Sequence, residues 1–297
     1  MRNLRVALTG ASGLVGSALA SFFAARGDAV VRLVRRPAAG ANEVAWDPDA
    51  GRIDGAKLER LDAVVHLAGA SIAKRWTARR RAAILNSRVE GTRLLVRTLA
   101  SLTSKPAVFV SASAIGYYGD SAAPVDESSP PGAGFLAEVV RAWEAETAPA
   151  PAAGIRTAVT RFGIILAEEG GALAKMLPAF RLGLGGPIGS GRQGFSWIEL
   201  DDIVRAIDHV VGDAAIAGPV NLVAPEPVPQ RVFAEALGRA LHRPARLPLP
   251  AAAVRILFGA MGEETLLGGA FVRPAVLLRS GFVWNAPRLD AALAGLR

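Results

Sequence analysis

The sequence has no cysteine, two tyrosines and three histidines, and each shortage excludes a kind of chemistry. Without cysteine the chain forms no disulfide and offers neither a thiol nucleophile nor a thiolate metal ligand. The histidines His66, His209 and His242 lie far apart and lack the spacing of metal ligands. The sequence therefore predicts no metal site.

Long apolar runs are also lacking. No stretch of about 18 uninterrupted apolar residues occurs, so the sequence predicts no membrane span. The first residues, Met1–Thr9, lead directly into an expected strand and leave no room for a signal peptide. We therefore expect a cytoplasmic protein with no membrane partner.

Acidic residues are outnumbered by basic ones, which gives a formal net charge of +8. The densest basic run is Lys74–Arg81, but aromatic residues make up only 6% of the chain and no nucleic-acid motif accompanies the run. We expect a solvated helix start, or a phosphate-facing edge of a cofactor cleft, rather than a nucleic-acid-binding surface. The positive charge favours a small-molecule substrate that is anionic.

The first half of the chain alternates apolar, β-rich runs with helical patterns, which is typical of a parallel sheet with crossover helices. In such a doubly wound sheet the ligand crevice lies at the carboxyl ends of the strands. The expected strands are Arg5–Thr9, Val30–Val34, Val44–Trp46, Ala63–Leu67, Ala107–Ala112 and Thr157–Phe162. The expected helices are Leu14–Arg26, Thr77–Leu102, Phe135–Thr147 and Ala172–Leu182.

The pattern changes after Leu166, where glycines crowd into Gly183–Gly191 and the strand–helix alternation loosens. A helix at Leu200–Val211 and a strand at Pro219–Val223 then return to the sheet pattern. We predict an α/β fold, a Rossmann-like doubly wound parallel sheet with a smaller C-terminal substrate lobe. The dinucleotide-binding domain would comprise residues 1–166 plus about 200–224, and the substrate-side lobe would comprise residues 167–199 and 225–297.

A glycine-rich turn, Thr9–Gly16, follows the first expected strand and opens the first expected helix. Gly10 permits the tight turn, Gly13 lets the backbone approach a pyrophosphate, and Gly16 allows the helix to pack on the sheet. The helix start offers free N–H groups to the phosphates; the alternative is an ordinary strand–turn–helix with permissive glycines. The expected cofactor contacts are Gly10, Ser12, Gly13, Leu14, Val15 and Gly16.

The end of the second expected strand distinguishes the two nicotinamide dinucleotides. A site for NAD(H) usually places a carboxylate there for the ribose 2′-hydroxyl, but this sequence has Arg35 and Arg36. A guanidinium pairs with a 2′-phosphate, which a carboxylate would repel. We expect NADP(H) rather than NAD(H), with Arg35 the first choice and Arg36 the second. The alternative is two solvated arginines in an arginine-rich chain.

Three segments resemble the extended short-chain dehydrogenase/reductase superfamily: the glycine turn Gly10–Gly16, His66–Gly69, and Ser111–Ser113. More narrowly, the chain resembles uncharacterised epimerase family proteins that are related to nucleotide-sugar epimerases. That likeness rests on Ser113–Asp120, on Gly185–Gln193 with Trp197–Ile198, and on the C-terminal tail. The resemblance implies a Rossmann domain, a nicotinamide cofactor and a C-terminal lobe on the substrate side.

The same resemblance assigns roles to single residues. The backbone of His66–Gly69 is expected beside the adenosine and ribose, and Arg88 occupies a place where many relatives have Asn. Ser113 matches the hydroxyl that hydrogen-bonds a reacting carbonyl or alcohol oxygen, or else it is a strand-end serine that bonds only to backbone. The further cofactor-binding residues that the resemblance implies are His66, Leu67, Ala68, Gly69, Arg88, Ser111, Ala112, Arg161, Gly163 and Ile164.

The sequence departs from this superfamily at its Tyr-x-x-x-Lys pair, in which a phenol moves a proton and a lysine lowers the phenol's pKa. Phe135 stands at the tyrosine position and Val139 at the lysine position, and neither can move a proton. Any phenol in the chemistry must be Tyr117 or Tyr118, which follow Ser113 closely. We expect the two adjacent rings to point in different directions, one toward the cleft, although simple aromatic packing is the alternative.

The expected substrate-binding residues follow from the glycine-rich second half of the chain: Lys175, Arg192, Gln193 and Trp197. Phe271–Pro274 and Gly281–Phe282 are expected to close the second lobe. The sequence as a whole favours an NADP(H)-dependent oxidoreductase or epimerase-like enzyme on a small polar carbonyl or sugar-type substrate. The alternative is an NADP(H)-binding sensor with little or no catalysis, which the missing Tyr/Lys pair suggests.

Overall fold

The computed structural model describes residues 3–296, and a largely parallel sheet of eight strands forms its centre. The strand order is β12-β8-β6-β5-β1-β2-β3-β4, and only the β3–β4 pair at the edge is antiparallel. The strands are β1 Arg5–Thr9, β2 Ala29–Val34, β3 Glu43–Asp47, β4 Arg52–Ile53, β5 Ala63–His66, β6 Val108–Ala114, β8 Arg156–Phe162 and β12 Gly218–Leu222. The predicted Rossmann-like, doubly wound sheet is confirmed.

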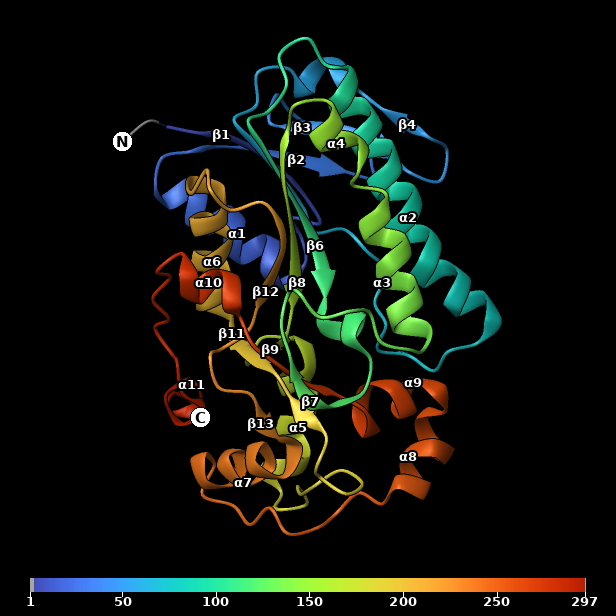
Figure 1. Ribbon diagram of the computed structural model, residues 1–297, viewed down its shortest axis with the longest axis vertical. Helices are drawn as coiled ribbons and strands as arrows, with labels where there is room; N and C mark the ends of the chain where they lie inside the picture. The colour runs from blue at the N-terminus through green and yellow to red at the C-terminus, as the bar shows by residue number, and fades with distance from the viewer. Residues whose placement is uncertain (1–2, 297) are drawn as a thin grey trace.

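Helices cover both faces of this sheet (Figure 1): α1, α6 and α10 lie on one face, and α2, α3 and α4 lie on the other. Their bounds are α1 Leu14–Ala25, α2 Ala78–Ser101, α3 Phe135–Ala145, α4 Pro149–Ala152, α6 Leu200–Gly212 and α10 Ala275–Arg279. The chain's strand order reverses between β1 and β5, which are neighbours in the sheet. In doubly wound sheets the dinucleotide crevice lies at this reversal, outside the carboxyl ends of the strands.

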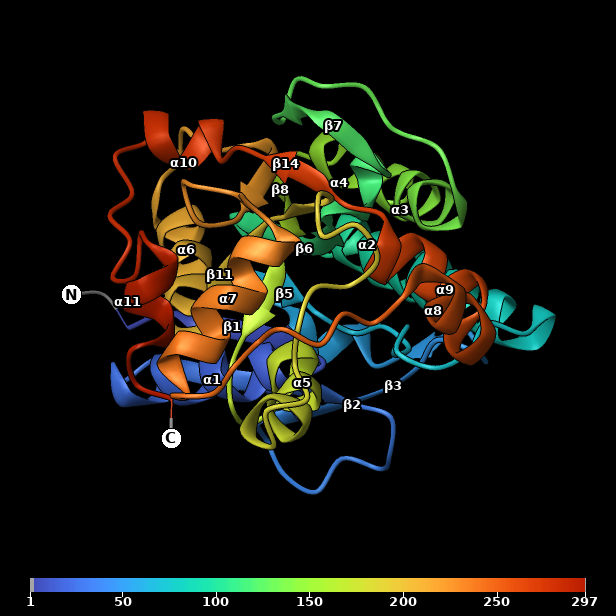
Figure 2. The same ribbon diagram turned by 90° about the horizontal axis from the view of Figure 1, so that it is seen from below.

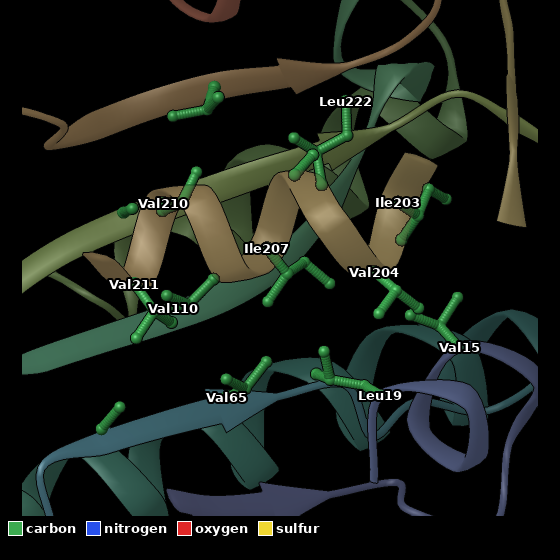
Figure 3. Packing of buried hydrophobic residues seen from close by; sticks show 14 of the residues in the cluster. Val15, Leu19, Val65, Val110, Ile203, Val204, Ile207, Val210, Val211 and Leu222 are labelled. Carbon is green, nitrogen blue, oxygen red and sulfur yellow. The ribbon is translucent and has the colours of Figure 1, made fainter. Parts of the chain in front are cut away.

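The alternation of side chains along β1 explains the two layers. Val6 and Leu8 belong to the core cluster beneath α1 and α6, whereas Ala7 between them belongs to the cluster beneath α2. Successive residues of a strand point to opposite faces, so an uninterrupted apolar strand needs a helix on each side. Figure 3 shows the first of these cores, in which side chains of α1, such as Leu19, lie near side chains of α6, such as Ile207.

The second lobe lies at the end of the molecule toward which β6 points (Figure 1), and Figure 2 shows its helices from below. Its core includes Phe195 and Phe233, whose stacked ring centroids lie 4.0 Å apart. Its strands are β9 Ile164–Leu166, β10 Gly194–Phe195, β11 Trp197–Glu199 and β13 Val228–Pro229. Its helices are α5 Gly171–Arg181, α7 Gln230–Ala240, α8 Ala251–Phe258, α9 Ala260–Gly262 and α11 Leu289–Leu293.

The C-terminal segment differs from the sequence expectation. Its strand β14, Ala270–Val272, pairs with β7, Ser121–Val125, a pairing that the sequence did not predict. The expectation that Phe282 closes the second lobe is wrong, because Phe282 and Trp284 pack in the core under α6. The part of the segment around Phe282 therefore packs on the Rossmann domain, and the chain then returns to the second lobe at α11. Across residues 3–296, no helix combines the length and the apolar character that a bilayer crossing needs.

Candidate functional site

Two glycines of the turn between β1 and α1 occupy places that a larger residue could not. Gly10 has a φ of +67°, and a Cβ on it would lie 3.0 Å from the carbonyl carbon of Leu67. A Cβ on Gly16 would lie only 2.1 Å from the carbonyl oxygen of Gly10. The turn therefore needs glycine both for its left-handed backbone and for the close packing of α1 on the turn.

The N-terminus of α1 is open. Its N-cap residue, Gly13, has no side chain to cap the helix, and its own N–H donates to the carbonyl of Gly10 at 2.9 Å. The first helical N–H with a helical partner is that of Ser17, which donates to Gly13. The N–H groups of Leu14, Val15 and Gly16 precede it and have no helical acceptor. Ser12 and Gly13 are exposed, so this end of the helix is accessible to an anion.

Thr9 ties this turn to the loop after β5. Its hydroxyl oxygen accepts hydrogen bonds from the N–H groups of Leu67 and Ala68, at 3.0 and 3.1 Å, and lies 2.7 Å from Nδ1 of His66. The imidazole is fully buried, its Nε2 lies 3.1 Å from Thr92 Oγ1, and burial lowers the pKa of His66 to about 4. The His66 side chain is thus a neutral structural group that fixes the loop.

Arg35 and Arg36 differ in their partners. Arg36 donates two hydrogen bonds to the Glu43 carboxylate, at 2.6 and 2.8 Å. Arg35 is exposed and forms no hydrogen bond or ion pair with any residue between 3 and 296. It is the arginine at the carboxyl end of β2 whose guanidinium is available to a ligand.

Glu144 on α3 joins the carboxyl end of β6 to that of β8. The Ser113 hydroxyl donates to its carboxylate at 2.5 Å. Arg161 donates to both carboxylate oxygens at 2.8 Å, and the Arg161 side chain is only 3% exposed. The alternative interpretation of Ser113, a hydroxyl bonded only to backbone, is wrong. The sequence analysis did not single out Glu144, because no local pattern marks a residue whose partners lie 17 and 31 positions away.

The two tyrosines lie beside this cluster in different environments, with their rings 83° apart. The Tyr118 hydroxyl donates to Asn221 at 2.8 Å and accepts from Arg161 at 2.9 Å, and burial raises the pKa of Tyr118 to about 12. Tyr117 is half-buried, with the Arg161 guanidinium carbon 3.5 Å from its ring centroid. Within residues 3–296, nothing hydrogen-bonds the Tyr117 hydroxyl. The Tyr118 hydroxyl is therefore bound in the interior, whereas Tyr117 has the free phenol among the described residues.

Comparison with protein families matches residues 6–222, most of the chain, to the NAD dependent epimerase/dehydratase family. The chain belongs to this family. Residues 249–296 match a second model, a domain of unknown function (DUF1731). The match confirms the family resemblance inferred from the glycine turn and the strand ends.

Known relatives extend over the full length of this epimerase-family chain. It is 41% identical over 295 residues to the epimerase family protein Mb2239 of Mycobacterium bovis, covering 99% of this chain and 97% of that protein. The crystal structure of human epimerase family protein SDR39U1 with NADPH superimposes with a TM-score of 0.90 at 37% identity, covering 98% of each chain. A nucleoside-diphosphate sugar epimerase of Corynebacterium glutamicum gives a TM-score of 0.82 at 33% identity, covering 99% of this chain and 58% of that one.

In this family member, the places of the superfamily's Tyr/Lys pair are filled by apolar packing. Phe135 and Val139 are buried in one cluster, and the Phe135 ring lies 5.0 Å from that of Trp76. The start of α3 is capped by Glu264, whose carboxylate accepts from the N–H groups of Phe135 and Leu136 at 3.0 and 2.9 Å. The C-terminal segment therefore holds the helix that carries Glu144.

The remaining cofactor candidates lie at the ends of β6 and β8. Ser111 and Ala112 are buried in β6, and the carbonyl of Ser111 accepts from Thr160. A Cβ on Gly163 would lie 2.7 Å from Val223 and 2.9 Å from a backbone oxygen, so the chain passes tightly there from β8 into β9. Ile164 then donates its N–H to Ser196 in the second lobe.

The four predicted substrate-binding residues divide into two pairs. Lys175 and Arg192 are exposed on the second lobe. Trp197 is only 1% exposed and packs in the core of that lobe, so its prediction as a substrate contact is wrong. The Gln193 amide donates to the backbone oxygens of Ile188 and Leu266, at 3.1 and 2.6 Å, and so holds the glycine-rich loop to the C-terminal segment.

Proposed function

We propose that this epimerase-family protein binds NADP(H) in the crevice at the β1–β5 reversal. The open N-terminus of α1 above two obligatory glycines carries this proposal, since it presents backbone N–H groups to a pyrophosphate. The exposed Arg35 would pair with the 2′-phosphate, whereas the guanidinium of Arg36 is already paired with the Glu43 carboxylate. The NADPH in the crystal structure of human SDR39U1 supports the same cofactor.

The cofactor would extend along the carboxyl ends of the central strands. We assign the backbone of His66–Gly69 to the ribose side, and Arg88, Ser111 and Ala112 to the walls beyond it. Arg161, Gly163 and Ile164 follow at the end of β8, where the chain enters the second lobe. The substrate would then lie between the strand ends and that lobe, where we propose the exposed Lys175 and Arg192 as its contacts.

We further propose an oxidoreductase or epimerase-like reaction on a small polar carbonyl or sugar-type substrate. The nicotinamide, when bound, supplies or accepts a hydride at a substrate carbon. Ser113 would accept a hydrogen bond from a substrate hydroxyl, because its own proton is directed to Glu144, so a reacting carbonyl oxygen would need another donor. Tyr117, whose hydroxyl has no partner among residues 3–296, would give the proton to that oxygen or take it.

Calorimetric titration of the purified protein with NADPH and NADH tests the cofactor. We expect measurable binding of both, with NADPH bound at least about tenfold more tightly, because only NADPH offers a phosphate to Arg35. Equal affinity for NADPH and NADH, or tighter binding of NADH, would show that Arg35 does not bind the 2′-phosphate. Absence of binding at millimolar concentrations of either dinucleotide would overturn the proposed function as a whole.

A second function, that of an NADP(H) sensor with little catalysis, is favoured by the apolar packing of Phe135 and Val139. Incubation with NADPH and a panel of aldehydes, ketones and nucleotide-linked sugars separates the two functions. Oxidation of NADPH that is lost in Tyr117→Phe supports the enzyme. Tight NADPH binding without oxidation by any compound supports the sensor.

A further inference from the structure

The guanidinium of Arg88 is a positive charge that pairs with no carboxylate among residues 3–296. Arg88 projects from α2, and its Nη1 donates to two backbone carbonyls, those of Ala70 and Ile84, both at 3.0 Å. No ion pair joins it to any acidic residue between 3 and 296. Its guanidinium carbon lies 5.1 Å from the centroid of the Trp143 ring, a cation–π contact that fixes its position.

Burial lowers the pKa of Arg88 to about 10, so the group remains charged at neutral pH. Because it is partly withdrawn from water, its field is screened less than that of an exposed arginine. Arg161 and Glu144 pair with each other, and the Glu264 carboxylate accepts from the start of α3 rather than from Arg88. Arg88 is therefore a charge without an ion-pair partner among residues 3–296.

The position of this charge follows from its contact with the loop after β5. A Cβ on Gly69 would lie 3.3 Å from the Arg88 guanidinium carbon, so the guanidinium packs directly against this loop. In the sheet, β5 lies on the opposite side of β1 from β2, the strand that carries Arg35. A dinucleotide whose adenosine half lies on the β2 side places its other half on the β5, β6 and β8 side. We therefore assign Arg88, which lies beyond the ribose side of the proposed site, to the nicotinamide half of the crevice.

We propose that Arg88 makes the site selective for the reduced dinucleotide, NADPH, over NADP⁺. The inference rests on the proposed NADP(H) site. The two forms share their phosphates and adenosine and differ at the nicotinamide ring, which is neutral in NADPH and positively charged in NADP⁺. A fixed guanidinium on that half of the crevice repels the oxidised ring and leaves the reduced ring unaffected. A protein built in this way retains NADPH when both forms are present.

The selectivity is measured as the ratio of two dissociation constants, for NADP⁺ and NADPH, at fixed ionic strength. We expect the unmodified protein to bind NADPH about tenfold more tightly, the order of effect that one partly screened charge produces. In Arg88→Gln the ratio should fall toward one because NADP⁺ binds more tightly, an outcome that structural damage would not produce. Arg88→Lys keeps the charge and should keep part of the preference.

Arg35→Ala is the matched control, since it removes an arginine from the other half of the crevice. It should weaken the binding of NADPH and of NADP⁺ by the same factor and leave the ratio of their dissociation constants unchanged. Should Arg88→Gln fail to fold, tetrahydro-NADP, whose ring is reduced further and uncharged, tests the unmodified protein instead. It should bind as tightly as NADPH.

Three results would overturn the inference: equal affinities of the unmodified protein for both forms, an unchanged ratio in folded Arg88→Gln, or tetrahydro-NADP binding as weakly as NADP⁺. Failure to bind either form at millimolar concentration is a different result. It would remove the proposed function, and the inference with it.

Discussion

The Ser113 hydroxyl and the Glu144 carboxylate lie 2.5 Å apart, and this contact joins a strand end of the Rossmann sheet to helix α3. Glu144 is held in turn by Arg161, whose guanidinium also contacts both tyrosines. Where the wider superfamily pattern has a phenol and an ammonium group on this helix, the present chain has the Glu144 carboxylate, which bonds both Ser113 and the Arg161 guanidinium of β8. The proposed chemistry depends on this cluster.

Replacing Glu144 with Gln should strongly destabilise the protein. The change leaves the buried guanidinium of Arg161 without its counter-charge, which we expect to cost about 3–5 kcal/mol in the free energy of unfolding, measured in urea. Glu146→Gln is the matched control, because Glu146 pairs with Arg93 at a more exposed place on the same side of the molecule. It should cost at most about 1 kcal/mol. Similar losses of unfolding free energy in the two variants would contradict the claim that Glu144 balances a buried charge.

Replacing Arg35 with Ala should weaken NADPH binding about 10- to 100-fold, the effect of losing charge-assisted hydrogen bonds to a phosphate. Affinity for NADH should hardly change, because it has no 2′-phosphate. In Arg36→Ala the loss should be much smaller, since Arg36 is already paired with Glu43. Calorimetric titration of both variants measures this. A larger loss of NADPH affinity in Arg36→Ala than in Arg35→Ala would show that Arg36, not Arg35, binds the 2′-phosphate.

Tyr117→Phe should affect turnover, whereas Tyr118→Phe should affect stability. Removing the Tyr117 hydroxyl should lower turnover about 100-fold or more on any compound that oxidises NADPH, while NADPH affinity and stability stay the same. Removing the Tyr118 hydroxyl breaks its bonds to Asn221 and Arg161 and should lower the free energy of unfolding by about 1–3 kcal/mol. Steady-state rates and urea denaturation of both variants check this assignment. Unaltered turnover in Tyr117→Phe would exclude its phenol from proton transfer.

The buried imidazole of His66 predicts a pH-dependent stability. Its pKa is about 4 in the folded protein, against 6.5 for an unperturbed histidine. Because the folded pKa is depressed, the unfolded chain takes up the proton first as pH falls. Stability due to this group is therefore complete above pH 6.5 and is lost between pH 6.5 and about 4. The loss should total on the order of 3 kcal/mol.

Urea denaturation of the unmodified protein and of His66→Asn across this range isolates the effect. The difference between their pH slopes belongs to His66, since both proteins share all other titrating groups. Parallel slopes would mean that the imidazole takes up its proton equally well in the folded protein.

The elements of the Rossmann half were predictable because their signals are local. Strand β1 has the predicted bounds Arg5–Thr9, and α1 begins at the predicted Leu14, since apolar alternation and a glycine-rich turn mark them within a few residues. The requirement for glycine at positions 10 and 16 comes from backbone geometry and close packing at the turn itself. The two arginines after β2 could be found in the same way.

Contacts between distant elements could not be predicted in this manner. Sequence spacing gives no sign that Glu144 meets Ser113, that Trp197 is enclosed by the second lobe, or that Phe282 returns to the core under α6. Each depends on how packed helices and strands direct side chains toward one another. Neighbouring residues thus specified the glycine-rich turn by steric rules of the backbone, whereas only tertiary packing decided which charges at the strand ends are paired and which are free.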